Sequence, residues 1–154
     1  MFINFWYAAA LASEVTADKP KSVKMLGQNF VLFRDTAGIA RCVSDICVHR
    51  GASLAGGKIK GDAVECPYHG WRFDGSGHCT RIPSLGVDGR PPARAKVDGY
   101  PTQEKYGLVF AFLGDLPEAE RPALLEIPEW GREGWRCINL EYSWTTNWER
   151  SMEA

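Results

Sequence analysis

Residues 47–54 read CVHRGASL and residues 66–71 read CPYHGW. Written as spacing, the pattern is Cys-x-His, then sixteen residues, then Cys-x-x-His, so each stretch supplies one thiol and one imidazole. Thiolates and neutral imidazoles are ligands that zinc, copper and iron share. The two stretches therefore predict a metal site built from Cys47, His49, Cys66 and His69.

The mixing of ligand types within each stretch favours two metal ions over one. A zinc finger usually takes both cysteines from one knuckle and both histidines from one helix. In a [2Fe-2S] cluster with mixed ligands, two thiolates hold one iron and two imidazoles hold the other. Loops that each supply one Cys and one His would then each contact both irons. A single structural zinc ion is the alternative.

The residues around the ligands suit tight loops. Glycine lets the backbone turn closely around a cluster and proline fixes φ, and Gly51, Gly70 and Pro67 stand beside the ligands. Tyr68 and Trp71 are placed to shield one side of the site from water.

Composition excludes several classes of partner. The chain has 154 residues, enough for one domain with its own core, and its 18 basic and 19 acidic residues are mixed evenly. No basic stripe is present, so nucleic acid is not expected as a partner. No apolar run approaches the roughly 20 residues that cross a bilayer, and the first fifteen residues lack the basic start of a signal peptide. We therefore expect a first strand at the N-terminus and a cytoplasmic protein with no membrane contact.

Five cysteines make an odd number, which argues against a disulfide framework. Cys42, Cys79 and Cys137 have no histidine in metal-ligand spacing. We expect all three to be small apolar filler in strands, since a free cysteine packs like a small hydrophobe.

Short apolar or alternating stretches recur between Gly, Pro and Asp residues, which is typical of many short strands. RDTAG and DGSG predict hairpin turns. An all-β domain is expected over residues 3–114, and its predicted strands are SVKML, NFVLFR, IARCV, AVE, WRFD, HCTRI, KVDGYP and GLVFAFLG. Residues 115–154 begin as a proline-rich connector, continue as a possible strand in RCINLEYSWTTNW and end in the helix-compatible NWERSMEA.

CVHRGASL and CPYHGWRFDGSGHCTRIPS resemble the cluster-binding loops of Rieske proteins. More narrowly, the chain is similar to the N-terminal domain of the large subunit of Rieske non-haem iron oxygenases, the ring-hydroxylating enzymes and their relatives. The resemblance implies a Rieske-type antiparallel β sandwich or barrel with a small cluster-binding subdomain formed by two loops. It also implies a [2Fe-2S] cluster on Cys47, His49, Cys66 and His69.

The resemblance also favours a low-potential subtype. Respiratory Rieske proteins resemble C-T-H-L-G-C and C-P-C-H-G-S, in which the extra cysteines form a disulfide. Here those two positions hold Ala52 and Tyr68, and Trp71 stands where that group carries Ser. Without the disulfide and the hydroxyl donor, we expect a reduction potential of roughly −150 mV, at the low end of the Rieske range.

By resemblance, such a domain takes electrons from a reductase or ferredoxin and passes them to a mononuclear Fe(II) held by two His and a carboxylate. His78 is the only histidine left for such a site, and we expect it to be a surface residue. Asn147, Trp148 and Glu153 fit the start of the family's catalytic domain, with Ala154 where Asn is often found. By family the protein is an oxidoreductase, but this chain alone lacks the mononuclear iron ligands.

Residues 115–154 are therefore expected to be a connector and the truncated beginning of an oxygenase catalytic domain. A stand-alone low-potential Rieske ferredoxin is the alternative, although such a carrier does not need this segment. The resemblance also implies a homotrimer or a catalytic-domain partner. Arg50 is expected to form a salt bridge within the subunit, with attraction of an acidic partner as the alternative. Asp45 and Glu65 are expected to be solvated strand ends.

Overall fold

The computed structural model describes residues 3–153. The chain divides into two compact units, the first ending at Leu124 and the second beginning at Leu125. The first unit contains three antiparallel sheets, and the second contains one short helix, α1 (Trp148–Glu153). Within residues 3–153 there is no other α-helix, so the predicted all-β fold is confirmed.

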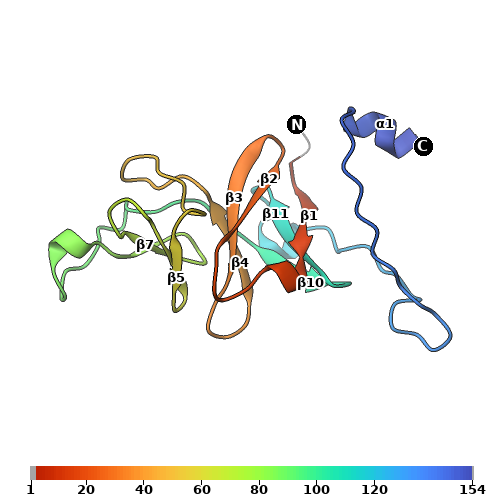
Figure 1. Cartoon of the computed structure of the whole chain (residues 1–154), viewed down its shortest axis with the longest axis horizontal. Helices are drawn as coiled ribbons and strands as arrows, with labels where there is room; N and C mark the ends of the chain where they lie inside the picture. The colour runs from red at the N-terminus through yellow and green to blue at the C-terminus, as the bar shows by residue number, and fades with distance from the viewer. Residues whose placement is uncertain (1–2, 154) are drawn as a thin grey trace. The chain divides into compact units, whose positions relative to one another are not determined.

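The three sheets have the strand orders β1-β11-β10, β2-β3-β4-β9 and β5-β6-β7-β8, and every pairing is antiparallel. In Figure 1, β1, β10 and β11 lie on one side of β2, β3 and β4, and β5 and β7 lie on the other. The strands are β1 (Phe5–Leu11), β2 (Lys21–Met25), β3 (Gln28–Arg34), β4 (Ala40–Ser44), β5 (Lys58–Lys60), β6 (Ala63–Glu65), β7 (Arg72–Asp74), β8 (Cys79–Arg81), β9 (Gly99–Tyr100), β10 (Thr102–Lys105) and β11 (Leu108–Leu113). Three short 3-10 turns are η1 (Ala12–Glu14), η2 (Pro83–Leu85) and η3 (Glu118–Glu120).

The inner strands β3 and β4 of the middle sheet are buried on both faces, and this positions the ligand loops. Side chains along a strand alternate between the two faces of its sheet. Phe30 and Leu32 of β3 pack into one core with β1 and β11, whereas Val31 and Phe33 pack into a second core with the β5–β8 sheet. Cys47 and Cys66 belong to this second core. The apolar run of β3 therefore joins the sandwich to the subdomain that carries both loops.

The predicted hairpin turns are confirmed. RDTAG connects β3 to β4 and DGSG connects β7 to β8, and Gly38 and Gly77 in them have φ of 78° and 88°. The first strand near the N-terminus is present as β1. Two strands were not predicted, because β5 (KIK) and β10 (TQEK) consist mainly of charged and polar residues.

After Leu124 the predicted helix is present and the predicted strand is not. NWERSMEA does contain helix α1, but residues 136–146 form no strand. Cys42 is fully buried filler in β4 as expected, and Cys79 packs partly against the second core. Cys137 is exposed and lies outside any strand, so its prediction as filler is wrong. No sheet partner for its segment is present within residues 3–153. Ala154 lies outside the described residues.

Candidate metal centre

The first ligand loop is a closed turn of six residues. The N–H of Cys47 donates to the carbonyl of Ala52 at 2.9 Å, and the N–H of Gly51 donates back to the carbonyl of Cys47 at 2.8 Å. Gly51 has φ of 71°, a left-handed conformation that favours glycine. The turn thus fixes the backbone on both sides of His49.

The second loop repeats this closure. The N–H of Cys66 donates to the carbonyl of Trp71 at 2.8 Å, and the N–H of Gly70 donates to the carbonyl of Cys66 at 3.1 Å. Gly70 also has φ of 71°. The cysteine therefore occupies the same position in both turns, while His69 is shifted by one residue relative to His49.

The two turns bring like side chains together. Cys47 and Cys66 are both buried, at 2% and 3% exposure, in the second core. The rings of His49 and His69 have centroids 4.6 Å apart, His49 half-buried and His69 exposed. The thiols thus lie inside the protein and the imidazoles lie toward its surface.

Burial shapes the chemistry of these groups. Burial raises the pKa of Cys47 to about 11, and the adjacent thiol of Cys66 adds to the increase. Burial lowers the pKa of His49, and the nearby His69 and Arg50 lower it further. The imidazole is thus kept neutral, the form that binds metals, whereas a metal ion must displace the thiol proton.

One atom of the site is unsatisfied. Nδ1 of His49 is buried and has no hydrogen-bond partner among the described residues. Leaving a buried polar atom unpaired costs about 1–3 kcal/mol, so such atoms usually have a ligand or a structural explanation. The indole of Trp71 stacks on the same ring at a centroid distance of 4.6 Å and an interplanar angle of 5°. The ring is therefore held in place with a free nitrogen, which fits a metal ligand.

The predicted shielding by aromatic residues is confirmed in part. Trp71 covers His49, as described, and Tyr68 contacts His69 with ring centroids 3.8 Å apart. Tyr68 is itself 60% exposed, and the neighbouring apolar residues Ile46 and Val48 are exposed as well. One imidazole is thus covered, and the other lies at an open apolar surface.

The proposed metal ligands lie in two pairs, Cys47 with Cys66 and His49 with His69. Across residues 3–153 no three His, Cys, Asp or Glu side chains converge as they would around one ion. A binuclear cluster requires only two protein ligands per iron, because sulfide completes each iron. The side chains present therefore fit a [2Fe-2S] cluster.

Two neighbours of the ligands differ from expectation. Asp45 is buried, not solvated: its carboxylate accepts from the Ser53 hydroxyl at 2.8 Å and from the Ala55 N–H at 2.7 Å. Its carboxylate thus fixes the end of the first loop, a role that the sequence did not predict because both partners lie eight or more residues further along the chain. Arg50 is exposed and forms no ion pair within the described residues, so the predicted salt bridge is wrong.

Glu65 forms an ion pair between two strands, and His78 lies at the surface. Glu65 accepts from Nε of Arg72 at 2.7 Å, across the strands that enter and leave the second loop. His78 is exposed, and its Nδ1 lies 2.9 Å from the Ser76 hydroxyl in the β7–β8 turn. The expectation that His78 is a surface residue is confirmed.

Comparison with known proteins agrees with this geometry. The sequence profile of the Rieske [2Fe-2S] domain matches residues 5–101. The chain belongs to the Rieske [2Fe-2S] domain family. The Rieske domain accordingly binds a [2Fe-2S] cluster, and its antiparallel sheets match those of solved family members.

The similar proteins are subunits of Rieske oxygenases. The alpha subunit of phenoxybenzoate dioxygenase from Ectopseudomonas oleovorans is 34% identical over 97% of this chain and 40% of its own length. The 4beta-methylsterol monooxygenase of Methylococcus capsulatus is 37% identical over 82% of this chain and 34% of its own. A crystal structure of dicamba monooxygenase superposes with a TM-score of 0.69 at 33% identity, covering 79% of this chain and 39% of that one.

This chain thus spans well under half the length of these relatives. It is an electron-transfer domain of the kind found in oxygenases. Among the described residues, the only α-helix is far too short to span a bilayer.

Proposed function

We propose that this chain is the electron relay of a Rieske oxygenase. Cys47, His49, Cys66 and His69 hold the [2Fe-2S] cluster, which when bound accepts and donates one electron at a time. The electron comes from a reductase or a ferredoxin and goes to a mononuclear Fe(II) site that activates O₂, outside these 154 residues. The observation that carries this proposal is the pairing of two buried thiols and, next to them, of two imidazoles, one half-buried and one exposed.

The burial of the ligands indicates which end of the site redox partners contact. The buried cysteines anchor the cluster to the core that joins the two parts of the domain. The imidazoles stand at the exposed end, where His69 and Tyr68 are accessible. We infer that partners exchange electrons through the histidine end, since tunnelling partners must approach closely.

Residues 115–154 are proposed to be the connector and the beginning of an oxygenase catalytic domain, following a Rieske domain of residues 3–114. The longer relatives support this, because each is a dioxygenase or monooxygenase of which this chain matches only a part. The first structural unit extends to Leu124, so the connector begins packed on the domain. We also propose assembly as a homotrimer or with a catalytic-domain partner, and a cytoplasmic location, which five free cysteines fit.

A stand-alone low-potential carrier is the second candidate. It is favoured by one observation: all four proposed ligands and both cores lie within the first unit. The two candidates differ in where the electron goes. Transfer to a separate catalytic chain that then consumes O₂ supports the oxygenase relay, whereas exchange with unrelated redox proteins alone supports the carrier.

The first test is the metal content of freshly purified protein. We expect two irons and two acid-labile sulfides per chain and no zinc, as the cluster formula requires. A redox titration should give roughly −150 mV, and a clearly positive potential would contradict the low-potential subtype. One zinc per chain without sulfide would overturn the proposed function.

Two variants then assign the ligands. Cys66→Ser should lose the cluster, whereas His69→Cys should keep an iron–sulfur cluster with a lower potential, because a thiolate adds negative charge. Cys42→Ser is the matched control, since Cys42 is buried in the other core and should leave the iron content unchanged. Wild-type iron content in Cys66→Ser would show that Cys66 is not a ligand.

A further inference from the structure

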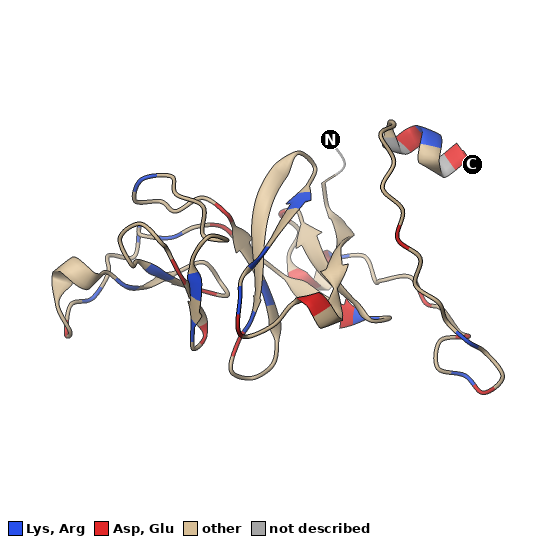
Figure 2. Ribbon diagram, in the orientation of Figure 1, with Lys and Arg blue, Asp and Glu red and all other residues tan. Residues whose placement is uncertain are grey.

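The charges of this chain are separated along the sequence. Residues 46–96, which carry both ligand loops and the β5–β8 sheet, contain eight Lys and Arg against four Asp and Glu, a net charge of +4. The remaining residues contain ten basic against fifteen acidic side chains, a net charge of −5. Figure 2 shows Lys and Arg along the strands of this subdomain. The cluster-binding part of a nearly neutral chain is therefore positively charged.

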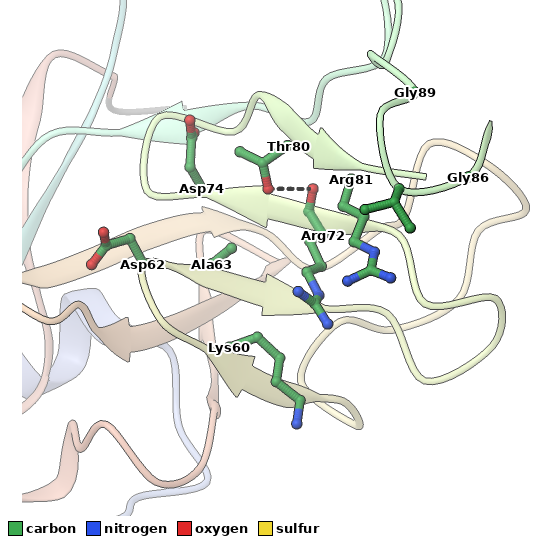
Figure 3. Close-up of a pocket in the computed structure, with 10 residues that line it drawn as sticks. Lys60, Asp62, Ala63, Arg72, Asp74, Thr80, Arg81, Gly86 and Gly89 are labelled. Atoms are coloured by element: carbon green, nitrogen blue, oxygen red, sulfur yellow. Dashed lines mark hydrogen bonds between the residues drawn. The ribbon is translucent and has the colours of Figure 1, made fainter. Parts of the chain in front are cut away.

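Part of this charge lines a pocket on the outer face of the β5–β8 sheet. Ile59, Val64 and Phe73 turn inward to the second core, so the alternate residues of the same strands face outward. The pocket has a volume of about 360 Å³, and its lining includes Lys60, Arg72 and Arg81. In Figure 3 these three side chains extend toward the same side of the pocket, and the carboxylates of Asp62 and Asp74 lie on the other.

The strand register places two of these cations directly opposite each other. Arg72 of β7 is the ladder partner of Arg81 of β8. Like charges at such positions destabilise a sheet. Glu65 neutralises only Arg72, and neither Arg81 nor Lys60 has an ion pair within the described residues. The sheet thus retains two uncompensated cations at one pocket.

The acidic residues of the pocket form no ion pair with these two cations among the described residues. Asp62 accepts the N–H and the hydroxyl of Thr36, in the turn between β3 and β4. Asp74 accepts the N–H groups of Ser76 at 2.9 Å and of His78 at 3.0 Å, in its own turn. One oxygen of each carboxylate is therefore held in a turn, and neither carboxylate pairs with Lys60 or Arg81 among the described residues, which leaves these two cations available to a carboxylate from outside.

The pocket adjoins the second ligand loop. Strand β6 ends one residue before Cys66, and β7 begins at Arg72, next to the Trp71 that stacks on His49. A protein bound to this face would lie beside the cluster loops. Complementary charge guides two redox proteins into such an encounter and raises its rate.

We propose that the outer face of the β5–β8 sheet, centred on Lys60, Arg72 and Arg81, docks the carboxylate-bearing face of the electron-donor protein. The inference rests on the proposed function and adds to it the location and the chemistry of the donor contact. It predicts an acidic donor, an encounter that weakens with salt, and a rate that depends on these side chains.

The test measures the second-order rate at which a reduced, acidic plant-type [2Fe-2S] ferredoxin reduces the cluster-loaded protein. The test variant is Lys60→Glu/Arg81→Glu. The matched control is Lys19→Glu/Lys24→Glu, which makes the same change of net charge at two exposed lysines outside the β5–β8 sheet. Photoreduced deazariboflavin, a small uncharged reductant, reports whether each protein still holds a working cluster.

At low ionic strength we expect the test variant to be reduced by ferredoxin about tenfold more slowly than wild type, with a flatter dependence on salt. The control should stay within about twofold of wild type. Lys60→Gln/Arg81→Gln should show a smaller loss and replaces the test variant if that fails to fold. All proteins should accept electrons from deazariboflavin at the same rate.

Equal ferredoxin rates in all proteins, or equal losses in both double variants, would overturn the docking surface while leaving the relay function intact. Wild-type protein that deazariboflavin cannot reduce would instead overturn the relay function. Salt effects are compared with chloride and phosphate at equal ionic strength. A drop in the wild-type rate that is specific to low millimolar phosphate and absent from the test variant would show phosphate competing with the donor at the pocket, and would support the docking surface.

Discussion

Asp45 fixes the first ligand loop because both of its carboxylate oxygens are used within that loop. One oxygen accepts the Ser53 hydroxyl and the other accepts the N–H of Ala55. Both contacts lie just after the closed turn that holds Cys47. The residue is therefore coupled to ligand position without being a ligand.

Asp45→Ala should lower both stability and cluster content. The Ala55 N–H and the Ser53 hydroxyl lose their acceptor in a partly buried position, which should cost about 1–3 kcal/mol in the free energy of unfolding. Denaturant unfolding and iron per chain measure the two effects. Asp88→Ala, at an exposed position in the loop after β8, is the control. Full iron content with unchanged stability would show that the loop holds itself without Asp45.

Asp35 gives the stability a pH-dependent component. Burial alone would raise the pKa of its carboxyl, but hydrogen bonds from the Ile39 N–H and from Nε of Arg41, and the Arg41 charge, hold the pKa below its usual value. Because the folded pKa is the lower one, this stabilisation is present above the unfolded pKa of about 3.9 and is lost as pH falls through the folded pKa.

Asp35→Asn should therefore melt at a lower temperature than wild type at pH 7, and the difference should shrink below about pH 4. Paired calorimetric scans from pH 7 to pH 3 measure this, since cluster loss in acid affects both proteins alike. Asp98→Asn is the control because Asp98 is exposed. A difference in melting temperature that stays constant down to pH 3 would assign the effect to packing instead of charge.

At the level of elements, the two ligand turns have the same backbone hydrogen bonds, although the spacing of Cys and His differs between them. The spacing of Cys and His predicted the ligands, because ligand chemistry depends on residue type. It did not predict the matching pair of hydrogen bonds in each turn, because His49 and His69 stand at different offsets from their cysteines. The sequence also did not predict that Asp45 is hydrogen-bonded within the loop or that Arg50 forms no ion pair among the described residues. Both depend on which residues the fold brings next to each side chain.

Strand prediction shows the same division. β3 was predicted from its apolar run, but its burial on two faces follows from which sheets pack on it. β5 and β10 carry little apolar signal and exist because neighbouring strands pair with them. The local sequence pattern therefore predicted most strands and the all-β class. That the middle sheet contributes to two cores is visible only in the tertiary structure.

Gly57 allows the first loop to pass close to β6. A Cβ at this position would collide with the backbone carbonyl of Glu65, the residue before Cys66. A Cβ on the adjacent Gly56 would meet only ordinary contacts, 3.7 Å from Pro67 and Ser53. The close approach of the two ligand-bearing segments thus depends on one of two neighbouring glycines.

Gly57→Ala should consequently destabilise the protein by about 1–3 kcal/mol and reduce the iron content, as overpacking against backbone does. Gly56→Ala should stay close to wild type in both measurements. Chemical denaturation and iron analysis of the two variants side by side make the comparison. Equal effects of the two substitutions would mean that the loops adjust to the added methyl group.

At the scale of the whole molecule, the first unit includes ten residues beyond the predicted boundary at residue 114. Nε1 of Trp6 donates to the carbonyl of Pro122 at 2.7 Å, and the guanidinium of Arg121 lies 5.4 Å from the centre of the Phe112 ring. Asn4 Oδ1 also accepts the N–H of Asp115 at 2.9 Å. These contacts attach the start of the connector to β1 and β11.

The second unit has the opposite character. Its residues from 138 to 144 alternate apolar and polar, a strand pattern, and their large apolar side chains are exposed: Ile138, Leu140, Tyr142 and Trp144. This segment has no sheet partner among the described residues. It favours self-association through unpaired backbone and apolar surface.

Two truncated chains test where the independent domain ends. A chain ending at Leu124 should keep its iron and sulfide content, melt within a few degrees of the full chain and self-associate less. A chain ending at Gly114 should be less stable than the Leu124 chain by about 1–3 kcal/mol, because it loses the Trp6 and Asn4 hydrogen bonds and the Arg121 contact. Iron analysis, denaturant unfolding and sedimentation compare the three chains. Cluster loss on truncation at Leu124 would show that residues 125–154 support the site, and equal stability of the two truncated chains would place the boundary at residue 114.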